Sequence, residues 1–163
     1  MQRLRVRQPS HTGHGIDGSQ PSVRGWIDAA PQATAAVTAT TLANVRVLVV
    51  EDDAQARDAT VTLLELLGAR VTAVPSVADA IAGVGREAPD VIVSDITMPV
   101  EDGFDLIRRL RDGTRPAIPM IALTACAGRD DESRIRAAGY DAYLAKPIDG
   151  SELVATVQRL AHR

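Results

Sequence analysis

The sequence predicts an α/β fold, namely a doubly wound, five-stranded parallel sheet of the (βα)5 type. From Val45 onward, apolar runs alternate with helical stretches of about a dozen residues, which is typical of parallel βα units. The apolar runs are continuous rather than alternating, as in strands that helices cover on both faces. With 163 residues, 45% of them hydrophobic, the chain is long enough to bury the core of one domain.

The sequence marks the ends of most elements. Gly68 ends the first helix and Gly139 the fourth, since glycine favours helix C-caps. Ser76 with Asp79 has the spacing of a capping box at the start of the second helix, and Asp149 begins the fifth in the same way. We therefore expect strands at 45–50, 69–74, 90–95, 118–123 and 141–145, and helices at 54–67, 77–86, 103–112, 129–138 and 150–161.

The order 2-1-3-4-5 is common for such a sheet and locates a candidate site. In this order the chain reverses direction between the first and third strands, and ligands bind outside their carboxyl ends. Glu51 and Asp52 follow the first strand, and Asp95 ends the third. Topology and chemistry thus predict the same place. For the neighbouring Asp53 we expect a role as the N-cap of the first helix.

Composition sets further bounds. Residues 1–43 are rich in polar residues and Gly, show no lasting periodicity, and are expected to form a flexible or disordered tail. The formal net charge of −3 gives no argument for direct DNA or membrane binding, and no apolar run approaches the length of a membrane span. The single cysteine, Cys126, fits a reducing compartment. We expect a cytoplasmic protein.

Four strand ends carry matching chemistry. Asp95, at the tip of a buried strand, has the exposure and rigidity that an aspartyl phosphoacceptor needs. Three converging carboxylates repel one another, and hard oxygen ligands of this kind suit Mg²⁺. Thr124 follows the fourth strand, and its hydroxyl is placed to donate to a phosphoryl oxygen. Lys146, the only lysine among 18 Lys and Arg residues, follows the fifth strand and indicates that a compact positive charge is needed there.

The motifs resemble those of a known family. They are Leu48-Val49-Val50-Glu51-Asp52-Asp53, Asp95-Ile96-Thr97-Met98-Pro99 with Asp102-Gly103, Leu123-Thr124-Ala125 and Tyr143-Leu144-Ala145-Lys146-Pro147. In this order and spacing they resemble the receiver domains of two-component response regulators, which have the flavodoxin-like fold. Two stretches, 121–125 and 142–147, look especially like the C-terminal receivers of hybrid sensor histidine kinases. Residues 44–163 would form the receiver domain.

The resemblance implies a phosphoryl-accepting signalling domain rather than an enzyme. Asp95 would accept the phosphoryl group from a histidine kinase or a histidine phosphotransfer protein. Mg²⁺ would be held by Glu51, Asp52, Asp95 and the main-chain carbonyl of Thr97. Lys146 would contact the acyl phosphate, and Thr124 with Tyr143 would act as the switch. Thr97 and Cys126 would tune dephosphorylation, and neither offers a carboxylate or amide to hold a water.

Two other classes of protein are weighed against this prediction. An aspartate-based phosphatase usually has a second acid two residues after its nucleophile, but position 97 is threonine. A phosphorylation-independent interaction module would not need every one of these site residues. Because the sequence ends just after the fifth helix, we expect signalling by docking to an unknown downstream partner or by phosphorelay. A derivation from a hybrid kinase stays open.

Overall fold

The computed structural model describes residues 41–112, 117–125 and 128–162. Most of the predicted tail, residues 1–40, lies outside the described residues, and so does Cys126. Strands and helices alternate through the described part, in the order predicted. The elements are β1 Arg46–Val50, α1 Ala54–Leu66, β2 Arg70–Val74, α2 Val77–Arg86, β3 Val91–Asp95, α3 Gly103–Leu110, β4 Met120–Thr124, α4 Arg129–Ala138, β5 Ala142–Ala145 and α5 Gly150–Ala161.

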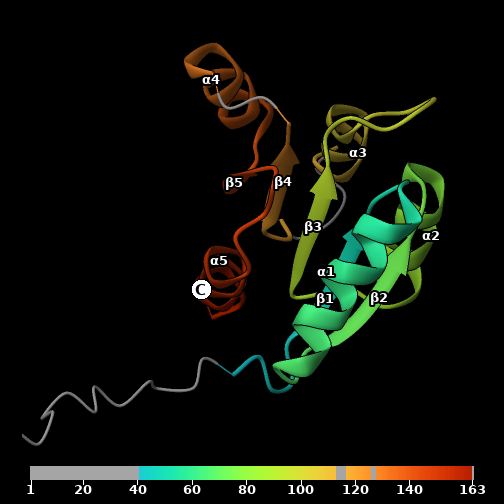
Figure 1. Ribbon diagram of the computed structural model, residues 1–163. Helices are drawn as coiled ribbons and strands as arrows, with labels where there is room; N and C mark the ends of the chain where they lie inside the picture. The colour runs from blue at the N-terminus through green and yellow to red at the C-terminus, as the bar shows by residue number, and fades with distance from the viewer. Residues whose placement is uncertain (1–40, 113–116, 126–127, 163) are drawn as a thin grey trace, which may run out of the picture. The chain divides into compact units, whose positions relative to one another are not determined.

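The five strands form one parallel sheet in the order β2-β1-β3-β4-β5, as predicted. In Figure 1 the arrows of β3 and β4 point the same way, and the yellow β3–α3 connection extends beyond the tip of β3. Strand β4 begins at Met120 rather than at residue 118, because Pro119 has no N–H to donate to the ladder. Because all five strands are parallel, the carboxyl ends of β1, β3, β4 and β5 lie along one edge of the sheet.

Each face of the sheet has its own core. One core joins alternate strand residues such as Val49 and Val93 to Leu64 of α1 and to Val157 of α5. The other core joins the intervening strand residues to α2, α3 and α4, with Ile135 buried from α4. Because helices cover both faces, β3 and β4 are buried along their whole length and β1 is buried after Arg46, as the apolar runs of the sequence indicate.

Side-chain caps begin the helices that the sequence marks. Asp53 accepts a hydrogen bond from the Ala56 amide at the start of α1, as expected. Ser76 caps α2, and Asp149 accepts two amide hydrogen bonds at the start of α5. Helix α3 begins with a capping box formed by Asp102 and Asp105. These caps fix where each strand-to-helix loop ends, and so fix the loops that line the site.

The packed domain begins before residue 44. Leu42 is fully buried among the residues of α1, α5 and the sheet, and its amide donates to the Leu67 carbonyl. Residues 41–43, which were predicted to belong to the tail, are therefore part of the packed domain. The local sequence gave no periodicity by which to find this contact, since one apolar side chain forms it.

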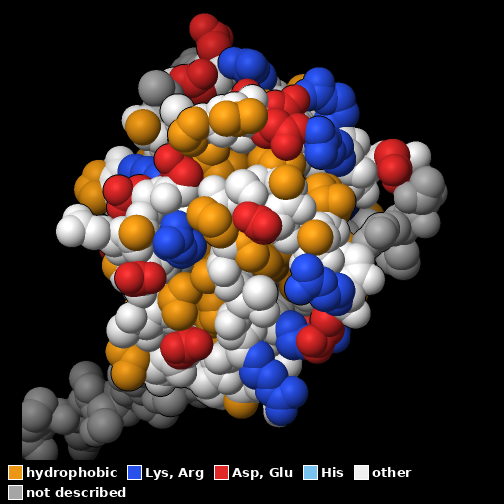
Figure 2. Space-filling view, turned by 90° about the vertical axis from the view of Figure 1, so that its right-hand side faces the viewer, with side chains coloured by type: hydrophobic (Ala, Val, Ile, Leu, Met, Phe, Trp, Pro, Cys, Tyr) orange, Lys and Arg blue, Asp and Glu red, His pale blue; other side chains and the backbone are white. Residues whose placement is uncertain are grey.

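One face of the domain carries mixed charge. Figure 2 shows the face on the right-hand side of Figure 1, where acidic and basic side chains are interspersed among apolar ones. No helix in the described ranges is both long enough and apolar enough to cross a bilayer.

Candidate functional site

The site is built at the carboxyl edge of the sheet. Glu51 directly follows β1, Asp95 is the last residue of β3, and Thr124 is the last residue of β4. Lys146 follows β5, where its amide donates to the Thr124 carbonyl at 2.8 Å and its peptide bond to Pro147 is cis. Residues from four strands thus reach one place.

Three carboxylates converge there. One oxygen from each of Glu51, Asp52 and Asp95 lies within 4.8 Å of the others. Glu51 and Asp95 are buried, whereas Asp52 is exposed to solvent. The structure therefore brings together the three side chains that the sequence predicts as metal ligands. An open, hard-oxygen group of this kind matches the ligand preference of Mg²⁺.

Lys146 bridges two of these carboxylates. Its Nζ lies 2.8 Å from Glu51 Oε2 and 2.7 Å from Asp95 Oδ2. Burial lowers the pKa of Lys146, but the hydrogen bonds to Asp95 and Glu51 outweigh burial, so the net pKa is raised. The ammonium group is accordingly charged at neutral pH. Lys146 thus places one ammonium charge between two of the three acids.

Glu51 is the most buried of the three carboxylates. Burial raises the pKa of Glu51, the charge on Asp95 raises it further, and the hydrogen bond from Lys146 opposes both. The ionised form of Glu51 is thus held at a free-energy cost that a bound cation would relieve. A divalent metal bound between the carboxylates would favour their ionised forms.

Backbone contacts orient the site. Asp95 Oδ1 accepts a hydrogen bond of 2.9 Å from the Thr97 amide, so Lys146 and Thr97 hold different oxygens of one carboxylate. Arg57 Nη1 donates to the carbonyls of Glu51 at 2.8 Å and of Asp52 at 3.2 Å. Sequence reasoning missed Arg57. Its position one turn into the helix after the acidic run was the only signal.

The two predicted switch residues lie in different surroundings. The Thr124 side chain is buried at the end of β4, beside the strand that ends in Asp95. Tyr143 is half-buried against the α2–α3–α4 side of the core. Interaction with Glu132 of α4 raises the pKa of the Tyr143 phenol. Tyr143 therefore contacts α4 rather than lining the carboxylate group directly.

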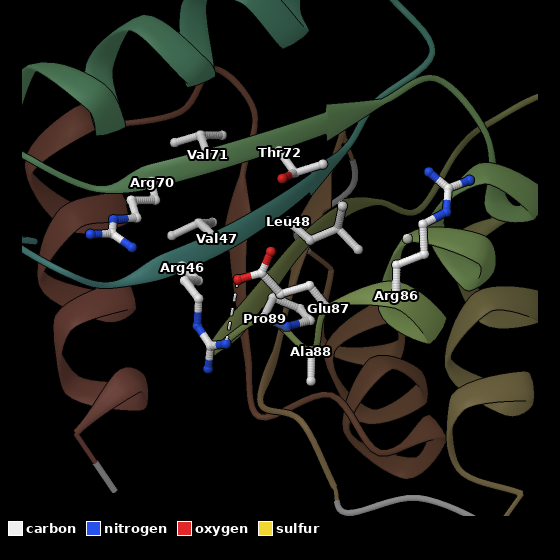
Figure 3. A pocket seen from close by; sticks show the side chains of 11 residues that line it. Arg46, Val47, Leu48, Arg70, Val71, Thr72, Arg86, Glu87, Ala88 and Pro89 are labelled. Carbon is white, nitrogen blue, oxygen red and sulfur yellow. Dashed lines mark ion pairs between the residues drawn. The ribbon is translucent and has the colours of Figure 1, made fainter.

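A hollow at the opposite edge of the sheet has different chemistry. A cavity of about 370 Å³ lies at the amino ends of β1 and β2, lined by Arg46, Arg70 and Arg86 among apolar side chains. Figure 3 shows the Arg46 guanidinium facing Glu87, with an ion pair of 3.7 Å between them. Doubly wound sheets bind ligands at the carboxyl ends of their strands. The carboxylate group lies at those ends and the arginine-lined cavity does not, so the carboxylate group is the candidate site.

Comparison with known proteins defines the class of this chain. The response regulator receiver domain model matches residues 47–158. The chain belongs to this family, the receiver domains of two-component systems.

Two relatives illustrate the match in sequence. The chain is 42% identical over 120 residues to the "Uncharacterized 14.6 kDa protein in sodA1 3'region" of Leptolyngbya boryana, covering 73% of this chain and 92% of that one. It is 38% identical over 117 residues to the transcriptional regulatory protein CseB of Streptomyces coelicolor, covering 72% of this chain. The chain spans about half (49%) of the length of CseB.

The structural matches cover nearly all of the corresponding domains. The Francisella response regulator 1452 receiver domain superposes with a TM-score of 0.70 and 32% identity, covering 74% of this chain and 98% of that one. The receiver domain of the sensor histidine kinase PA1611 from Pseudomonas aeruginosa superposes with a TM-score of 0.64 and 35% identity. That match covers 74% of this chain and 100% of the other, whose structure has magnesium coordinated in the active-site cleft.

Proposed function

We propose that Asp95 accepts a phosphoryl group from a histidine kinase or a histidine phosphotransfer protein. The protein then signals by docking to a downstream partner or by relaying the group to a histidine. The observation that carries the proposal is the environment of the Asp95 carboxylate. One oxygen lies 2.7 Å from Lys146 Nζ, the other accepts the Thr97 amide, and Glu51 and Asp52 lie beside it.

Mg²⁺ fits this group of ligands. Its ligands would be Glu51, Asp52, Asp95 and the main-chain carbonyl of Thr97, leaving further positions for water and for a phosphoryl oxygen. When bound, Mg²⁺ would neutralise the carboxylates and the charge on the phosphoryl oxygens. The buried Glu51 supports the assignment, because burial raises its pKa and a bound cation would favour its ionised form.

The transfer step needs little covalent chemistry from the protein. An oxygen of Asp95 forms a bond to phosphorus, while the bond from phosphorus to the donor imidazole nitrogen breaks and the imidazole keeps the electron pair. Lys146 then places its charge beside the phosphoryl oxygens, and Thr124 offers a hydroxyl to one of them. Phosphoryl transfer is accelerated mainly by positioning and charge stabilisation, which these side chains supply.

Thr124 and Tyr143 would transmit the signal from the phosphorylated site to the surface. Phosphorylation would draw the Thr124 hydroxyl toward the phosphoryl group and alter the packing of the neighbouring β4–α4 region. Tyr143 is placed to sense this change because it packs against the core cluster that includes Ile135 of α4 and interacts with Glu132 of the same helix. A ligand reorders an element only through differential contacts with its two states, and Thr124 would make such a contact.

Stoichiometric labelling tests the proposal against its alternatives. The protein is incubated with a small phosphodonor and Mg²⁺, and intact mass is followed along with free phosphate. We expect the gain of one phosphoryl group per chain, which is lost when a chelator is present. Sustained release of phosphate over many turnovers would indicate a phosphatase, and no mass gain would indicate an interaction module independent of phosphorylation.

Two adjacent aspartates provide a matched pair for the metal. Asp52→Asn removes a proposed ligand and should weaken Mg²⁺ binding, measured by calorimetry, by about tenfold or more. Asp53→Asn changes the next carboxylate, which caps α1, and asparagine caps equally well. Equal Mg²⁺ affinities for the two variants would remove Asp52 from the ligand set.

A further inference from the structure

The loop after Asp95 is closed at its base by Gly103. The Gly103 amide donates to the Ile96 carbonyl at 3.0 Å, so residues 96–103 form a closed connection between β3 and α3. This connection carries Thr97, whose amide holds Asp95 Oδ1. The place of Gly103 therefore determines the place of Thr97 relative to the carboxylates.

Tyr140 fixes Gly103 from another part of the chain. Tyr140 lies between α4 and β5, is only 5% exposed, and donates its hydroxyl hydrogen to the Gly103 carbonyl at 2.8 Å. The contact is close: a Cβ added to Gly103 would lie 2.8 Å from the Tyr140 hydroxyl and 2.7 Å from the Asp95 carbonyl oxygen. The phenol, the glycine and the end of β3 thus pack against one another without spare room.

Ser94 joins the same polar cluster. Its hydroxyl donates to the Asp95 carbonyl at 2.8 Å and lies close to the Tyr140 phenol. Burial raises the pKa of the Tyr140 phenol far above its usual value, so the group stays a neutral donor. A phenylalanine would fill the same apolar volume. The hydroxyl itself makes the specific contact, which is the hydrogen bond to the Gly103 carbonyl at the end of the loop.

We propose that Tyr140 is a positioning residue that holds the β3–α3 loop, and with it Thr97, in the geometry required for Mg²⁺ binding and phosphorylation. The inference rests on the proposed function. It adds that a residue outside the carboxylate group, on the α4–β5 connection, controls the affinity of that group for the metal. Supporting residues of this kind commonly alter metal affinity through the ligands that they orient.

The first test is Tyr140→Phe, which keeps the ring and removes only the hydroxyl. Mg²⁺ affinity is measured by calorimetry, and the Mg²⁺ dependence of phosphoryl labelling is measured separately. We expect Mg²⁺ to bind about five- to tenfold more weakly, with labelling recovered at higher Mg²⁺ concentration. Hydrogen exchange supplies a readout that needs no metal: the Gly103 amide should exchange faster in the variant.

A control separates positioning from general loss of stability. Val157→Ala creates a small cavity on the α1–α5 side of the sheet, where Val157 is fully buried. This variant should lose stability but keep the Mg²⁺ affinity of the wild type. Unchanged Mg²⁺ affinity in Tyr140→Phe would overturn the proposal, and so would equal weakening in both variants. Absence of Mg²⁺ binding and labelling in the wild type would instead reject the proposed function, and unchanged Gly103 exchange would then reject the loop contact as well.

Discussion

A methyl group added at Gly103 should perturb the domain sharply. A Cβ at this position would lie 2.7 Å from the Asp95 carbonyl oxygen, 2.8 Å from the Tyr140 hydroxyl and 2.9 Å from Ile96 Cα. Two of these three atoms belong to the backbone, so a side-chain rotation cannot relieve the overlap. Overpacking typically costs about 1–3 kcal/mol, and displacing the Tyr140 hydroxyl from its partner costs about 1 kcal/mol more. We therefore expect Gly103→Ala to lower the free energy of unfolding by about 2–4 kcal/mol.

Gly83 is the matched control for this change. It lies inside α2, and a Cβ there would meet no atom within 4 Å. Gly83→Ala should therefore stabilise the protein by about 0.5–1 kcal/mol, because alanine favours the helix. Urea denaturation followed by circular dichroism measures both variants. The steric argument is wrong if Gly103→Ala unfolds at the same urea concentration as the wild type, or if the two alanine variants change stability alike.

Three further predictions follow from other parts of the domain. Hydrogen bonds from Arg46 lower the pKa of Asp90 below 3.8, so their stabilisation is present above that pH and is lost as pH falls through the lower folded-state pKa. Asp90→Asn should cost about 1 kcal/mol at pH 7, and the difference from wild type should shrink below about pH 4 in denaturation curves. Leu42→Ala should lower the free energy of unfolding by about 2–5 kcal/mol, because Leu42 is fully buried. Deletion of residues 1–40 should leave phosphoryl labelling unchanged, and a large loss of labelling in the shortened chain would contradict this division. The phosphorylated form should decay on the order of minutes or longer, because Thr97 cannot position water as a carboxylate would; decay within seconds, followed by mass spectrometry, would refute this.

The fold and the central site could be predicted because both follow local patterns. Continuous apolar runs defined the strands, and the predicted strand order brought Glu51 and Asp95 to neighbouring strand ends. Lys146 was predictable as the only lysine of the chain, set at the end of the last strand. Parallel strands place their carboxyl ends at one edge, so residue type and position were sufficient.

The supporting contacts were not predictable, because they depend on packing between distant segments. Tyr140 and Gly103 are 37 residues apart, and no periodicity relates them. The burial of Leu42 likewise depends on the space between α1 and the sheet rather than on its own sequence neighbours. Tyr143 could be placed on its strand, but its contact with Glu132 required the position of α4.

The most direct test of the central claim is the location of the phosphoryl group. The protein is labelled with a small phosphodonor and Mg²⁺, digested, and mapped by tandem mass spectrometry, with Asp95→Ala treated in parallel. The proposed mechanism predicts a single modified residue, Asp95, and no mass gain in the variant. A phosphoryl group found on another residue of the wild type, or equal labelling of Asp95→Ala, would contradict it.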